Sequence, residues 1–125
     1  MRDKPFVHQQ GSDAFSVRFV GAQRDLVKEA LLWIIHRREA DATIRVWAGC
    51  NTARLERLYE RVKGADQNVF SIEELHVLHA VLLSLYSVFV SEEDFHIKIG
   101  FYRENALALA NGLVKAVGNA MTETG

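Results

Sequence analysis

The uncharged stretch from residue 75 to residue 91 constrains the fold of this chain more than any other segment. It contains no Asp, Glu, Lys or Arg, and its length is close to the lower limit of about 17 residues for a membrane-spanning helix. It contains two histidines and three serines, however, and a pair of glutamates stands on each side of it. These polar groups favour a helix buried in a protein core.

Apolar spacing within this stretch predicts the central helix of the fold, near residues 72–90. Large apolar side chains recur at alternating intervals of three and four residues, which is the spacing of a helix-packing seam. They are Leu75, Leu78, Leu82, Leu85 and Phe89. Ser71 followed by Glu74 is the pattern of a capping box, so we expect the helix to begin directly after Ser71.

The N-terminal half contains two segments with the period-two alternation of half-buried strands, residues 15–19 and 43–49. Residues 22–35 between them have helical spacing, and residues 52–64 form a further amphipathic pattern. A strand, a helix and a second strand in this order predict a right-handed parallel crossover. Residues 5–9 offer a third strand.

These patterns together predict an α+β fold that is rich in helix. We expect a small two- or three-stranded sheet in the N-terminal half, packed with about five helices, and a helical corner over residues 92–121. One domain accommodates the whole chain, residues 1–125. Its ends, residues 1–13 and 122–125, are expected to be flexible.

Charge and cysteine content bear on the partners and the location. Fifteen basic and sixteen acidic side chains give a formal charge of -1, so no overall field attracts nucleic acid or an anionic membrane. The single cysteine excludes an intramolecular disulfide, and the N-terminal segment lacks the apolar run of a signal peptide. We therefore expect a cytoplasmic protein whose partners are neither nucleic acids nor membranes.

Self-association is predicted from the helix over residues 22–35. Its middle, "ALLWII", is apolar around most of the helix circumference, which a small sheet cannot cover alone. A two-stranded sheet would also leave unpaired edges. Both features predict a homodimer or a larger closed assembly, with Leu31, Trp33 and Ile35 at the interface.

A candidate ligand site follows the segment at 43–49, where a new helix begins. Free backbone N–H groups and the helix dipole favour an anion there. The candidate residues are Gly49, Cys50, Asn51, Thr52 and Arg54. The same position is expected to lower the pKa of the Cys50 thiol and make it reactive. The phosphate-binding Cys loop of phosphatases is absent, because Glu56 stands where that loop requires Arg.

A second candidate for an anionic ligand lies at the start of the last helix, at Tyr102, Arg103 and Asn105. An arginine at the start of a helix opposes the helix dipole, so an acidic group is expected beside it. That group is either a carboxylate of the preceding turn or an acidic ligand.

Histidines on the central helix are candidate metal ligands. Glu73, His76 and His79 follow one another at intervals of three and share one side of the helix, and His96 offers a further nitrogen. Two histidines and a carboxylate are a suitable donor set for zinc or iron. The alternative is that His76 is solvated and that His79 packs at the edge of the seam. We predict no cofactor, with a divalent metal as the alternative.

The corner near Gly100 resembles a helix-turn-helix, with apolar residues at the positions where the two helices would face each other. These are Phe95, Ile99, Ala106 and Leu109. His96 stands where a small residue is usual, and its ring would separate the helices. The second helix also begins with Glu104 and has no basic cluster before Lys115, so phosphate contacts are missing. A packing corner is the preferred interpretation.

The predicted function is that of a non-catalytic binding or regulatory protein acting as a homo-oligomer. No nucleophile has a visible base partner, and no glycine-rich phosphate loop is present. The ligand would be another protein or a small anionic molecule. The alternatives are a DNA-binding regulator of the helix-turn-helix type and a small metal- or thiol-dependent enzyme.

Overall fold

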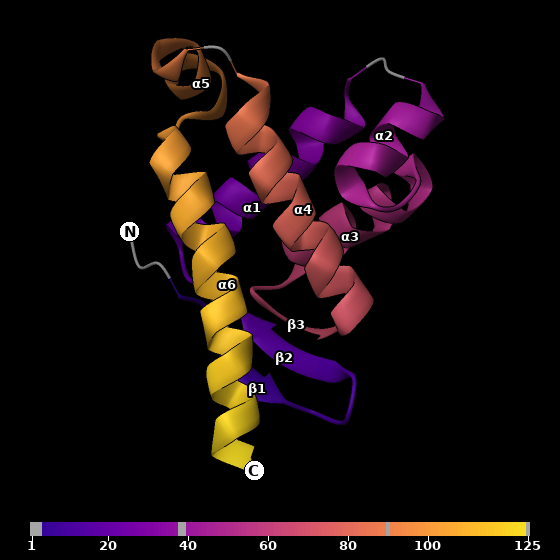
Figure 1. Ribbon diagram of the computed structural model, residues 1–125, viewed down its shortest axis with the longest axis vertical. Coiled ribbons are helices and arrows are strands. Elements are labelled where there is room, and N and C mark those ends of the chain that lie inside the picture. Colours follow the sequence, from indigo (N-terminus) through magenta and orange to yellow (C-terminus); the bar gives the residue numbers. More distant parts are fainter. Residues whose placement is uncertain (1–3, 38–39, 90, 125) are drawn as a thin grey trace.

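The computed structural model describes residues 4–37, 40–89 and 91–124 (Figure 1). In chain order the elements are β1 (Phe6–Gln9), β2 (Ala14–Arg18), α1 (Ala22–Ile35), α2 (Asp41–Ala48), α3 (Thr52–Gly64), β3 (Gln67–Ser71), α4 (Ile72–Val88), α5 (Glu92–Ile99) and α6 (Arg103–Thr124). The fold is therefore α+β and rich in helix, as the sequence predicts. None of the described helices is both long and apolar enough to cross a lipid bilayer.

The three strands form one antiparallel sheet in the order β1-β2-β3. Phe15 of β2 lies opposite Phe70 of β3, and Val17 lies opposite Val7 of β1, so their side chains share the face that packs into the core. Residues 5–9 do contribute a strand, as predicted. The predicted parallel crossover is wrong, because β2 pairs with β3, and helices α1 to α3 intervene between them in the sequence.

Residues 43–49 were predicted as a strand but form most of helix α2 and its C-cap, Gly49. Ile44 and Ala48 are buried four residues apart, whereas Val46 between them is 84% exposed. Asp41 and Arg45 form an ion pair across one turn, at 2.8 Å. Over so short a stretch, the spacing of the apolar residues fits both the period of two of a strand and the period of 3.6 of a helix. Packing of this segment on α4 favours the helix.

Helix α4 is the central element, as predicted. Figure 1 shows it between α6 on one side and α2 and α3 on the other. The capping box is present: Ser71 Oγ accepts a hydrogen bond from the Glu74 N–H, and Glu74 Oε1 accepts one from the Ser71 N–H. The predicted seam from Leu75 to Phe89 is buried throughout. The helix itself ends at Val88, and residue 90 of the predicted span lies outside the described residues.

The predicted corner is formed by α5 and α6, with Gly100 in the left-handed region at φ 82°. The apolar side chains predicted to face each other there are buried. The separation expected from His96 is wrong, because its exposed ring stacks on Tyr102 with the ring centroids 4.5 Å apart. His96 therefore lies outside the helix crossing.

The three residues predicted as an interface on α1 point in different directions. Leu31 is 0% exposed within the single chain, so its assignment to an interface is wrong. Trp33 packs on Phe89 with the ring centroids 4.7 Å apart, and Ile35 is half-buried. Each helical residue is turned by about 100° from the previous one, so side chains at 31 and 33 cannot share a face.

Parts of both segments that were expected to be flexible belong to regular elements. Residues 6–9 pair with β2, and residues 122–124 belong to α6. Residues 1–3 and 125 lie outside the described residues. The flexibility expected of residues 1–13 and 122–125 stays a prediction.

Two glycines allow the fold to be tested with one chemical change. Gly100→Ala places a methyl group at a positive φ and should lower the free energy of unfolding by about 1 to 2 kcal/mol. Gly118→Ala, within α6 and with no atom near the added carbon, should raise it by about 0.5 to 1 kcal/mol. Urea unfolding of both variants measures the difference, and equal shifts of the same sign would contradict the corner described here.

Candidate functional site

Residues predicted for two separate sites lie beside one another at the start of α4. Arg54 Nη2 of α3 is 3.5 Å from Glu73 Oε2 of α4. His76 lies next to Gly49, since a Cβ atom added to this glycine would be 3.9 Å from His76 Cδ2. These four residues line a shallow hollow of about 370 Å³, together with Ile72 and Val77. The anion-binding and metal-binding candidates therefore share one surface.

The start of α3 is already partly occupied by its own side chains. Asn51 Oδ1 accepts a hydrogen bond from the Arg54 N–H at 3.0 Å, which is the expected N-cap. The Arg54 guanidinium has Glu73 as its partner. Thr52 is half-buried and Cys50 is buried. An incoming anion would have to compete with the Glu73 carboxylate for Arg54.

Cys50 does not have the lowered pKa that its position predicted. Burial raises the pKa of the Cys50 thiol, and the nearby charge of Arg54 only partly opposes that effect. Loss of hydration therefore outweighs the charge of Arg54. A thiol in this state is a poor nucleophile near neutral pH.

The four candidate metal ligands do not converge. His76 and His79 both border a hollow between α4 and α6, but Glu73 is paired with Arg54, and His96 lies on α5 near the other end of α4. Among the residues that the structure describes, no three His, Cys, Asp or Glu side chains are grouped closely enough to hold a metal ion. Burial lowers the pKa of His79, and the neighbouring His76 adds to this effect.

The second candidate anion site is used to join α6 to α4. Arg103 Nε donates to the Tyr86 carbonyl at 3.0 Å, and its guanidinium lies 4.7 Å from the centre of the Tyr86 ring. Glu92 Oε1 accepts from the Arg103 N–H, and Asn105 Oδ1 accepts from the Tyr102 N–H. The acidic group expected near Arg103 is thus Glu92 of the chain itself, bound to its backbone amide. Thirteen positions along α4, or about 20 Å, separate this cluster from Glu73.

The surface of the corner between α5 and α6 is unsuited to DNA binding because of its charge. The first turn of α5 carries Glu92, Glu93 and Asp94, and Glu104 follows at the start of α6. Arg103 is engaged with Tyr86. These carboxylates would repel a phosphate backbone.

An uncharged face, here called the seam face, runs along α4 and α6 and was missed from the sequence. On each helix its residues recur at intervals of three and four. They are Ile72, His76, His79 and Leu83 on α4, and Leu107, Ala110, Val114, Val117 and Met121 on α6. None of them is Asp, Glu, Lys or Arg. Ala110 is buried, whereas Ile72, Val114 and Met121 are 47%, 56% and 49% exposed.

The two rows of the seam face enclose a hollow of about 370 Å³ near the start of α4. The hollow is lined by Ile72, Leu75, His76, His79, Leu113, Val114 and Val117. The spacing on α6 is visible in the sequence from Leu107 onward and could have predicted one row. The row on α4 was concealed by its histidines, which were interpreted as metal ligands.

No protein-family model, curated protein or solved structure is significantly similar to this chain. The function must therefore be inferred from its own surfaces.

The lowered pKa of His79 predicts a change of stability with pH. The native protein binds a proton at His79 less readily than the unfolded chain, in which the pKa is about 6.5. The stability that depends on neutral His79 is complete above about pH 6.5 and is lost as the pH falls through the lowered pKa.

His79→Gln should therefore reduce the loss of unfolding free energy between pH 7 and pH 5, measured by urea unfolding at one protein concentration. His8→Gln, at an exposed position of β1, is the control for the substitution itself. An unchanged pH slope in His79→Gln would contradict the role given to His79.

Proposed function

We propose that this protein is a non-catalytic binding protein that acts as a homodimer, with the seam face of α4 and α6 as its interface. The observation that carries the proposal is the pair of adjacent helices whose uncharged residues repeat at intervals of three and four, with Ile72, Val114 and Met121 about half exposed. This spacing lets side chains of one helix pair interlock with those of another, as in four-helix bundles. A second copy supplies two helices with the same spacing.

The charges beside the seam face favour a second copy over an unrelated partner. Glu73 lies at its border on α4, with a side chain that is 82% exposed, and the exposed Lys115 lies on the outer side of α6. Both are at the same level, because Ile72 and Val114 line one hollow. A half-turn about an axis parallel to the helices places α4 of one copy beside α6 of the other. Each Glu73 then approaches Lys115 of the second copy.

A binding role is favoured over the alternatives by the chemistry of the individual side chains. The raised pKa of Cys50 disfavours a thiol enzyme. Acidic residues on the corner disfavour a DNA-binding regulator. Arg54 and Arg103 are engaged within the chain, so a protein ligand is favoured over a small anion.

Val114→Glu tests the proposed interface. It places two carboxylates per dimer in an apolar contact, so the dissociation constant should rise by about 100-fold or more. Val46→Glu is the matched control, because Val46 is 84% exposed on α2, away from the seam face. Sedimentation velocity over a range of concentrations should show dimers of the wild type and Val46→Glu but monomers of Val114→Glu. A wild type that stays monomeric at high concentration would refute the proposal.

The relative orientation of the two copies has a separate test. Glu73→Lys and Lys115→Glu each place like charges together and should weaken the dimer by about threefold to tenfold. The double variant restores opposite charges and should recover most of the wild-type affinity at low salt. If the two single effects simply add in the double variant, the proposed axis is wrong.

A further inference from the structure

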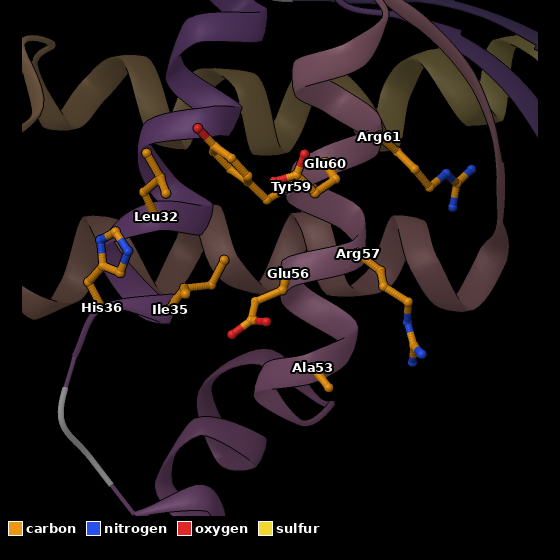
Figure 2. A pocket seen from close by; sticks show the side chains of 9 residues that line it. All are labelled: Leu32, Ile35, His36, Ala53, Glu56, Arg57, Tyr59, Glu60 and Arg61. Atoms are coloured by element: carbon orange, nitrogen blue, oxygen red, sulfur yellow. The ribbon is translucent and has the colours of Figure 1, made fainter.

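A groove of about 940 Å³ lies between α1 and α3 on the outer side of the molecule (Figure 2). Its apolar lining consists of Leu32 and Ile35 from α1 and Tyr59 from α3, all half-buried. Leu32 and Ile35 belong to the apolar middle of α1, for which the sequence predicted burial against a second surface in addition to the sheet. Helix α3 packs against α1 but leaves this strip open.

Two glutamates border the groove. Glu56 and Glu60 are exposed, lie one turn apart on α3, and form no ion pair within the part of the chain that the structure describes. Arg57 and Arg61 also line the groove, but Figure 2 shows their side chains directed away from Leu32 and Ile35. Arg61 is bound there to Glu74 and to the Val69 carbonyl. The part of the groove that faces α1 therefore has the charges of Glu56 and Glu60 beside its apolar floor, whereas the arginines lie at its far border.

We propose that this groove binds an amphipathic helix of a partner protein, with its apolar side chains on Leu32, Ile35 and Tyr59 and its lysines or arginines beside Glu56 and Glu60. Residues spaced by three on α1 and by four on α3 form ridges at helical spacing, which suit the side chains of a third helix. The opposite charges fix the orientation of the bound helix and exclude acidic helices.

The groove and the seam face are different surfaces. Helix α1 packs against α4 on the core side, whereas the seam face is the exposed side of α4 and α6. A homodimer formed through the seam face leaves the groove open, so the two proposals can fail independently.

A pair of synthetic helical peptides provides the test. One has leucines on one face and lysines on the other, and its counterpart has glutamates in place of the lysines. Fluorescence anisotropy of the labelled peptides with the full chain should show at least tenfold tighter binding of the lysine peptide. A peptide with the same residues in scrambled order, and hence no apolar face, should bind at least tenfold more weakly.

Charge reversal on the protein identifies the site. Glu56→Lys with Glu60→Lys should weaken binding of the lysine peptide by at least tenfold. Glu93→Lys with Glu104→Lys makes the same change of net charge at exposed positions on α5 and α6 and should leave the affinity within twofold of the wild type. Thermal unfolding of both double variants checks that each is folded.

Three results would overturn the proposal. If both double variants weakened binding of the lysine peptide equally, the peptide would be attracted by the net charge of the protein alone. Equal binding of the scrambled peptide would mean that a small cationic group is recognised without a helix. Amide chemical-shift changes at the seam face, with none at residues 32–36 and 53–60, would place the peptide on the wrong surface.

Discussion

The structure depends on the enclosure of α4, a helix with no charged residue after Glu74. Its start is fixed by the capping box at Ser71 and Glu74, and Arg61 of α3 is paired with the same Glu74. Its far end is fixed by Arg103, which donates to the Tyr86 carbonyl. Because the core, α6 and the α2–α3 pair cover the other sides of α4, only one row of its side chains remains open. That row becomes half of the seam face.

The features that were predicted correctly from the sequence are those that depend on interactions between residues close together in the chain. The capping box, the buried seam of α4 and the glycine turn at Gly100 all depend on residues within a few positions of one another. Strand β3 was missed because Phe70 is its only buried side chain and its existence depends on pairing with β2, about 50 residues earlier. Residues 43–49 were assigned to a strand because the contact with α4 that selects a helix is also distant in sequence.

The candidate sites show the same limit. The sequence placed His76 and His79 together on one helix, but their neighbours Val114 and Gly49 come from distant segments. Those neighbours change the interpretation from a metal site to part of an apolar contact surface. Burial similarly reverses the expected shift in the pKa of Cys50. The distinctive features of the molecule are two partly uncovered apolar surfaces, the seam face and the groove between α1 and α3. Exposed apolar surfaces of this kind often mark sites of protein interaction.

The central claim is that the seam face is covered in solution by a second copy of the chain. Hydroxyl-radical footprinting across a range of protein concentrations tests it most directly in the wild-type protein. The account predicts that labelling of Ile72, Val114 and Met121 falls as concentration rises, while labelling of Val46 and Ile97, which are 84% and 71% exposed, stays constant. Labelling of the seam face that does not change with concentration, in a range where the control positions are also constant, would contradict the account.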